Sequence, residues 1–159
     1  MSASPFARRR LVLAIALTDS TFVRTPVRGE ACWVGRCLHC NTKLVVPEIG
    51  APASTVTVEH IVPQTHGGDD DLANVALACA RCNNEKGWRH DVKHVDDPGR
   101  VALERVLFDR RTSRMREPPD GTEHLLTSPY AETITDPSAP SDTPRPPRRM
   151  PRGRGKRRR

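Results

Sequence analysis

A chain of 159 residues, of which 36% are hydrophobic and 4% aromatic, has room for one small domain with tails, and this excludes a large apolar core. A bound metal ion is therefore an expected source of stability. The formal net charge of +7 does not describe the folded part, because residues 145–159 hold nine basic and no acidic side chains. The remainder of the chain is close to neutral.

We treat residues 1–26 as an N-terminal extension. The triplet Arg8-Arg9-Arg10 followed by an apolar run of seven residues, 11–17, has the order of a secretory signal, but Thr18-Asp19-Ser20 offers no small-x-small cleavage site. The run is also too short to cross a bilayer. We interpret it as a strand or short helix, and we expect a cytoplasmic protein without a membrane partner.

Two Cys-x2-Cys pairs lie in the predicted folded unit, residues 27–117. They are Cys37 with Cys40 and Cys79 with Cys82. A disulfide framework is an alternative, but this spacing favours zinc in a reducing compartment. Four thiolates close a tetrahedral shell and leave no position for a substrate, so we expect Zn²⁺ to be structural and its removal to unfold the domain. Cys32 is expected to be a buried thiol, and His39 to be exposed.

Two strands and a helix are predicted around the second pair. Residues 55–62 are β-branched and roughly alternating, which is typical of a strand, and Pro63 ends it. Residues 75–78 form a second short strand. A helix is expected to begin near 79–82 and to run past Lys86.

The connecting segments have their own signals. Glycines and carboxylates make 65–71 a loop, in which Asp69–Asp71 is interpreted as a solvated, turn-initiating run. Residues 98–108 have the apolar spacing of an amphipathic helix, with Asp96 or Asp97 as its cap and proline in its first turn.

The C-terminal segment 118–159 is rich in proline and polar residues, so we predict a disordered linker and a basic tail. The tail would act as a sequence-independent nucleic-acid arm whose cations displace counterions from phosphates. Its cations at and beyond position 148 are Arg148, Arg149, Arg152, Arg154, Lys156, Arg157, Arg158 and Arg159. A solvated tail without dedicated function is the alternative.

The order strand, loop, strand, helix, with these residues, resembles the HNH endonuclease family and its ββα-metal fold over residues 37–90. The matched positions are Cys37, Cys40, Glu59, His60, Pro63, Gly67, Gly68, Leu72, Asn74, Leu77, Cys79, Cys82, Asn83 and Lys86. The resemblance implies an α+β fold, a small ββα-metal domain pinned by the four-cysteine zinc site. It also implies phosphodiester hydrolysis that leaves 3′-hydroxyl and 5′-phosphate ends.

Histidine, carboxylate and amide side chains suit metal-assisted hydrolysis. Histidine is suited to general-base chemistry near neutral pH, and His60 would take the proton from the attacking water, as its counterpart does in the family. Glu59 and Asn83 would hold a catalytic Mg²⁺ or Mn²⁺, since hard ions prefer oxygen ligands. Lys86 would contact phosphate or, as the alternative, belong to the ordinary helix surface, and Asn74 would organise the loop next to His60. Many family members have aspartate at the Glu59 position and histidine at the Asn83 position.

Strand geometry raises one difficulty for this site. Neighbouring strand residues point to opposite faces, so Glu59 and His60 should diverge unless a twist or bulge near Pro63 turns both toward the helix. Asn83 and Lys86, three residues apart, should share one helix face.

We expect an intracellular DNA endonuclease acting on double-stranded DNA, which a phage could encode. One alternative is a non-catalytic, zinc-dependent nucleic-acid-binding module. Another is a nuclease subunit that works only in a phage packaging or repair complex. Target sequence, pathway and oligomeric state do not follow from the sequence.

Overall fold

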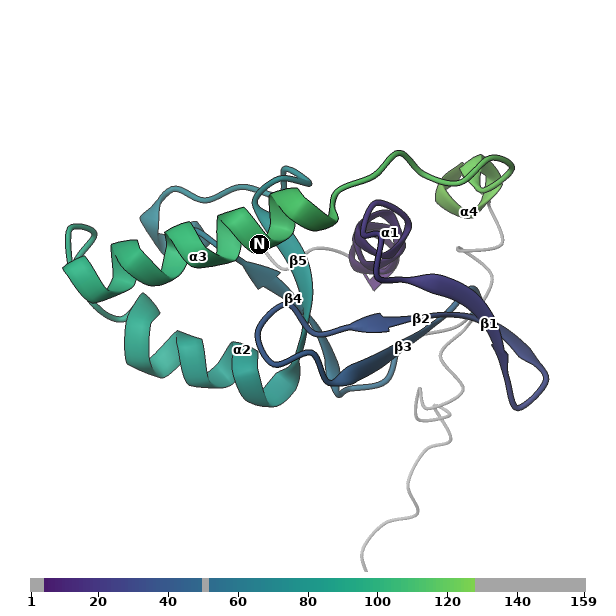
Figure 1. Cartoon of the computed structure of the whole chain (residues 1–159), viewed down its shortest axis with the longest axis horizontal. Coiled ribbons are helices and arrows are strands. Elements are labelled where there is room, and N and C mark those ends of the chain that lie inside the picture. The colour runs from purple at the N-terminus through teal and green to yellow at the C-terminus, as the bar shows by residue number, and fades with distance from the viewer. Residues whose placement is uncertain (1–4, 50–51, 128–159) are drawn as a thin grey trace, which may run out of the picture.

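The computed structural model describes residues 5–49 and 52–127 (Figure 1). Its elements, in chain order, are α1 (Pro5–Leu17), β1 (Val23–Val27), β2 (Glu30–Arg36), β3 (Lys43–Pro47), β4 (Val56–His60), the 3-10 turn η1 (Gln64–His66), β5 (Val75–Cys79), α2 (Ala80–Lys86), its π-helical continuation η2 (Gly87–Asp91), α3 (Pro98–Arg114) and α4 (Glu123–Thr127). In Figure 1, α2 and α3 lie at one end of the molecule and the strands β1 to β3 at the other. The predicted α+β class is confirmed.

The three-stranded sheet has the order β1-β2-β3 and is antiparallel throughout. A two-residue turn joins β1 to β2, and both of its residues, Arg28 (φ 53°) and Gly29 (φ 85°), have positive φ. Such a turn matches the right-handed twist of the strands that it connects. On β2, a side chain at Gly35 would meet the ring of Phe22 at 2.3 Å, so the absence of one lets Phe22 pack on the sheet.

The second sheet is the hairpin β4–β5, and it confirms the two predicted strands. Its register pairs Glu59 with Ala76 and His60 with Val75. No extra residue interrupts this ladder, so the bulge that would turn Glu59 and His60 to one face is absent from β4. The predicted helix follows β5 directly as α2, which begins at Ala80.

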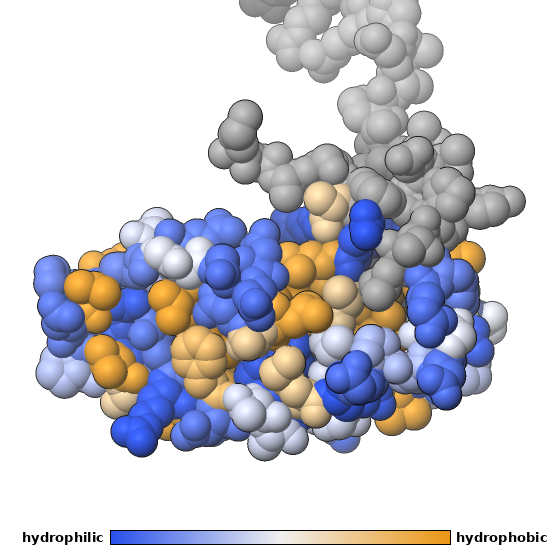
Figure 2. All heavy atoms as spheres, turned by 90° about the horizontal axis from the view of Figure 1, so that it is seen from above, coloured by the Kyte–Doolittle hydropathy of each residue, from blue (hydrophilic) through white to orange (hydrophobic). Residues whose placement is uncertain are grey.

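Helix α3 confirms the predicted amphipathic helix and its cap. The Asp97 carboxylate accepts a hydrogen bond from the backbone N–H of Arg100 at 3.0 Å, and this bond lowers the pKa of Asp97. The helix continues to Arg114, six residues beyond the predicted end, and three arginines of its last turns donate to the rest of the fold. From above, the surface intermixes apolar and hydrophilic residues (Figure 2). Val101 and Val106 of α3 are exposed.

Helix α1 supplies much of the main core. Five of its side chains are buried there, namely Val12, Leu13, Ile15, Ala16 and Leu17. They pack with Phe22, which lies between α1 and β1, with Trp33 of β2 and with Leu77 of β5. The apolar run in the segment treated as an extension is therefore packed against the hairpin that carries His60. A second, smaller core joins α3 to the other face of the hairpin through Leu107 and Ala76.

The expectation of disorder from residue 118 onward needs correction for its first ten residues. The structure describes the chain to residue 127, with α4 against α1, Leu125 packed on the main core and Thr122 buried. Leu125 and its neighbours bury apolar surface that composition alone did not assign to the core. Residues 128–159, with the whole basic tail, lie outside the described residues. In the described part, none of the helices is long and apolar enough to cross a membrane.

Candidate functional site

The four paired cysteines come together as one cluster. The Sγ atoms of Cys37, Cys40, Cys79 and Cys82 all lie within 4.8 Å of one another. Cys40 and Cys79 have their sulfurs 3.8 Å apart, far longer than a disulfide bond. Two thiolates bound to one tetrahedral zinc at about 2.3 Å would be about 3.8 Å apart. The cluster is therefore positioned to form a metal site, and its donor set fits zinc.

Backbone contacts dock the first cysteine pair against the hairpin. The N–H of Leu38 donates to the carbonyl of Leu77 on β5 at 3.0 Å, and the N–H of Cys79 donates to Sγ of Cys37 at 3.3 Å. Asn41, with φ of 59°, closes the turn by donating its N–H to the carbonyl of Cys37. These bonds bring together ligands that are about forty residues apart in sequence.

The thiols of this cluster differ in acidity. Hydrogen bonds from the hydroxyl and backbone N–H of Thr42 lower the pKa of Cys40 to about 6. Burial raises the pKa of Cys37 and of Cys82. The contacts of Cys40 thus favour its thiolate, whereas burial of Cys37 and Cys82 favours their protonated thiols, which a bound cation would have to deprotonate.

His60 lies at the end of β4, and its side chain is 22% exposed. Its Nε2 is 2.7 Å from Oδ1 of Asp70, the middle residue of the acidic run that was expected to be solvated only. Gln64 donates to the same oxygen at 3.3 Å. The structure thus gives His60 a carboxylate partner, which a run of three adjacent aspartates could not reveal in the sequence.

Asn74 binds the two sides of the loop together. Its Oδ1 accepts from the backbone N–H of Val62 at 2.9 Å, while its Nδ2 donates to the carbonyls of Val62 and Asp69. The side chain is buried. Asn74 thus bridges the backbone after β4 and the backbone of the acidic run.

Glu59 points to the opposite face of the strand and is fully buried. Its Oε1 lies 3.0 Å from Nζ of Lys86, as an ion pair without hydrogen-bond geometry, and its Oε2 lies 3.1 Å from Nε2 of His39. Lys86 also donates to the carbonyl of His60 at 2.9 Å and to Asp91 at 2.7 Å. Glu59 is thus held inside the protein by two cationic or polar partners.

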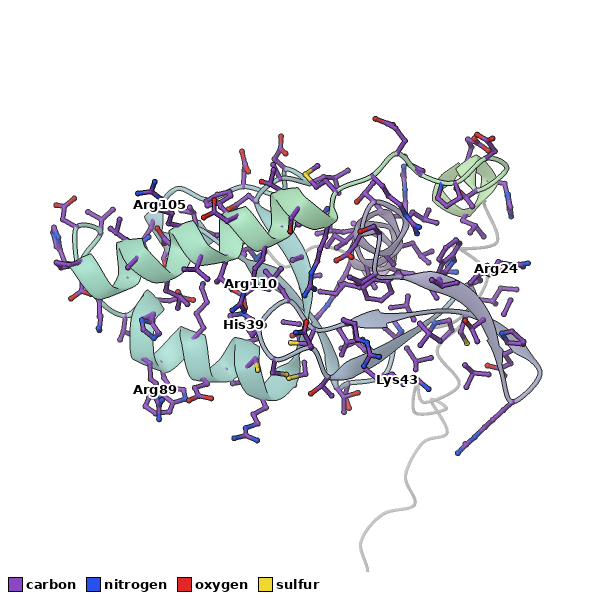
Figure 3. The ribbon with its side chains drawn as sticks, viewed as in Figure 1. Arg24, His39, Lys43, Arg89, Arg105 and Arg110 are labelled. Carbon is purple, nitrogen blue, oxygen red and sulfur yellow. The ribbon has the colours of Figure 1, made fainter. Side chains whose placement is uncertain are left out.

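His39 was expected to be exposed, and its side chain is instead only 15% exposed. Figure 3 shows it between α2 and α3, with Arg110 of α3 beside it. The guanidinium of Arg110 donates to the carbonyl of His39 at 2.9 Å. The position of His39 depends on the docked cysteine turn, which the local sequence does not specify.

The two residues predicted to hold a catalytic divalent ion have contacts within the protein. Asn83 donates its side-chain amide to the carbonyl of Val58 at 3.3 Å, and Glu59 is paired with Lys86 and His39. Within residues 5–49 and 52–127, the four cysteines are the sole group of three or more histidine, cysteine or acidic side chains close enough to share an ion. Glu59 and Asn83 as ligands of a catalytic ion therefore stay a prediction, whereas the Lys86 side chain is buried, at 3% exposed.

An antiparallel hairpin followed by a helix, with a histidine at the strand end and four converging thiols, defines a small metal-binding ββα domain. Residues 37–89 match the family model described as HNH endonuclease, which is about one third of the chain. The match confirms the resemblance noted in the sequence, and the four cysteines of this segment are positioned to form a metal site. No curated protein and no solved structure matches the chain.

Proposed function

We propose that this protein is an endonuclease that hydrolyses phosphodiester bonds of double-stranded DNA, with His60 as general base. The HNH match supports nuclease activity in general. The environment of the His60 ring supports its role as the general base. The ring is partly exposed. Asp70 contacts one of its nitrogens, and the other has no hydrogen-bond partner among the described residues. A ring held at one nitrogen is suited to remove a proton at the other.

The chain's own residues account for part of this chemistry. Attack on phosphorus by water needs a base, and a positioned histidine contributes roughly 10²- to 10⁴-fold. Asn74 keeps the loop against the end of β4, so the ring of His60 has a defined environment. The products would carry 3′-hydroxyl and 5′-phosphate ends.

We also propose Mg²⁺ or Mn²⁺ as the catalytic cofactor, because a divalent ion would stabilise charge on the phosphate oxygens. The residues predicted to bind it, Glu59 and Asn83, are bonded within the protein, and so is Lys86. This observation favours one second candidate, a zinc-dependent nucleic-acid-binding module without catalysis. A nuclease that requires a packaging or repair complex is compatible with the same geometry.

Nicking of supercoiled plasmid in Mg²⁺ or Mn²⁺ tests the proposal, with zinc-loaded wild type compared with His60→Ala. His66→Ala is the matched control, since His66 lies in the same loop and its side chain has only the neighbouring Thr65 as a partner among the described hydrogen bonds. We expect nicking by wild type and His66→Ala and a loss of at least about 100-fold in His60→Ala. If folded wild-type protein binds DNA in a gel-shift assay but does not nick it, the endonuclease proposal is contradicted and the non-catalytic binding module is supported.

The basic tail is proposed as the nucleic-acid arm, and the cytoplasm as the location. Removing residues 145–159 should weaken plasmid binding and flatten its dependence on salt, because fewer counterions are released. Equal salt slopes for the two chains would refute the arm.

A further inference from the structure

We propose that Asp70 is a positioning residue for His60, which holds the ring as its Nε2–H tautomer and leaves the lone pair of Nδ1 for the attacking water. This inference rests on the proposed function of His60 and names the group that prepares it. Asp70 acts through His60 and touches no substrate itself.

The first step of the argument is the chemistry of the contact. Oδ1 of Asp70 lies 2.7 Å from Nε2 of His60, which is a short, charge-assisted distance. An ionised carboxylate only accepts hydrogen bonds, so the ring nitrogen has to donate. A neutral histidine carries one ring proton, and a proton on Nε2 leaves Nδ1 as the acceptor.

The second step is that the loop fixes the backbone on both sides of Asp70. The carbonyl of Asp69 accepts from Asn74 at 2.9 Å, and the carbonyl of Asp71 accepts from the backbone N–H groups of Asn74 and Val75 at 2.8 and 3.0 Å. Asp70 therefore stands between two anchored residues, and its side chain is the one of the three that reaches His60.

The third step is the close approach of the loop to the strand end. A Cβ at Gly68 would lie 1.8 Å from the carbonyl oxygen of Val62, so only glycine permits this path. The N–H of Gly68 donates to the carbonyl of Pro63 at 3.0 Å. Since Val62 and Pro63 directly follow the end of β4, this contact brings the acidic run within reach of His60.

The neighbouring aspartates have other partners. Oδ1 of Asp69 accepts from the backbone N–H of Asp71 at 3.2 Å, and Oδ1 of Asp71 accepts from that of Ala73 at 2.8 Å. Gln64 donates to Oδ1 of Asp70, the same atom that His60 contacts. The loop thus offers a natural control, because removal of Asp69 changes the local charge equally without touching the ring.

The direct test is ¹⁵N NMR of the histidine rings in the zinc-loaded full chain, at a pH where the ring of His60 is neutral, with His60→Gln used for assignment. We expect the Nε2–H tautomer in wild type, in Asp69→Ala and in Asp70→Asn, whose amide oxygen still accepts. Asp70→Ala should give a mixture of tautomers. An Nδ1–H ring in wild type, or a pattern in Asp70→Ala identical to wild type, overturns the proposal.

Single-turnover plasmid nicking supplies the second readout. Asp70→Ala should lower the rate of the chemical step roughly 10- to 100-fold and change plasmid affinity less than about twofold, because Asp70 acts only through the base. Asp70→Asn should restore most of the rate, and Asp69→Ala should resemble wild type. Equal losses of rate in Asp70→Ala and Asp69→Ala would mean that Asp70 contributes only its negative charge and does not position His60. Because the NMR measurement needs no activity, failure of the nuclease proposal and failure of the Asp70 proposal are distinguishable.

Discussion

Nζ of Lys86 lies 3.0 Å from Oε1 of Glu59, and the side chains are only 3% and 0% exposed. The ammonium occupies the neighbourhood of Glu59 in which a divalent cation was expected. Lys86 joins the end of α2 to the end of β4, since it also donates to the carbonyl of His60. A lysine that was expected to contact phosphate thus neutralises a buried carboxylate in this structure.

Replacing Lys86 by methionine should lower the free energy of unfolding by about 3–5 kcal/mol, because it leaves Glu59 charged and buried without its cation. Urea unfolding of zinc-loaded protein measures the change. The double variant Glu59→Gln, Lys86→Met should recover much of it, because Asp91, with its side chain 23% exposed, is then the one carboxylate left without this cation.

Glu85→Gln is the matched control for that experiment. Its ion pair with Arg89 is exposed, at 40% and 54% for the two side chains, so the loss should stay below about 1 kcal/mol. A similar loss of unfolding free energy in Lys86→Met and Glu85→Gln would mean that the buried ion pair stabilises the fold no more than the exposed one does.

The sequence predicted the parts of this site that depend on local periodicity. Alternation predicted β4, and with it the divergence of Glu59 and His60. A capping aspartate and a first-turn proline predicted the start of α3. These signals are short in range, which is why they could be read from one chain.

Contacts between distant segments could not be read in the same way. His39 and Glu59 are twenty residues apart, and they meet only because the cysteine turn docks on β5. Helix α1 packs on the hairpin from the far end of the sequence, and its seven-residue apolar run indicated burial without indicating a partner. The choice of Asp70 among three aspartates likewise depends on how Asn74 folds the loop.

Arg111 is fully buried, and its loss should be among the most damaging on α3. Its Nε donates to the carbonyl of Leu72 and its Nη2 to the hydroxyl of Thr18, both at 3.0 Å, so it joins the loop before β5 to the end of α1. Burial lowers its pKa. Arg111→Lys should lower the unfolding free energy by about 2 kcal/mol or more, since an ammonium cannot reproduce the planar fork.

Thermal unfolding of Arg111→Lys beside Arg105→Lys isolates that effect. Arg105 is exposed on the same helix, and its replacement should change the unfolding free energy by less than about 0.5 kcal/mol. Matching melting curves for the two variants would contradict the structural role of Arg111.

Glu48 should make the fold sensitive to acid. Its carboxylate accepts two hydrogen bonds from Arg24, at 2.5 and 3.0 Å, and these lower its pKa. A lowered pKa in the folded state gives stability that is complete above the unfolded value and is lost as pH falls through the folded value. Glu48→Gln should therefore flatten the dependence of unfolding free energy on pH below about 4.5. The effect should shrink at high salt, because the Arg24 side chain is 64% exposed.

Zinc removal should unfold the domain. The cluster holds the turn at Cys37 against the start of α2, and α3 binds that turn, with Arg114 donating to the side chain of Asn41 at 2.7 Å. Structural zinc contributes about 10–16 kcal/mol in small domains, which is as much as the whole stability of a typical domain, about 5–15 kcal/mol. Chelation, or Cys79→Ser, should thus abolish the cooperative transition in circular dichroism and the bound zinc measured by mass spectrometry.

Cys32→Ala is the control for this experiment. Cys32 is buried outside the cluster, so the variant should keep one zinc per chain. A cooperative transition that survives in the metal-free protein would mean that the two cores hold the fold alone, and that zinc serves the cysteine turn only.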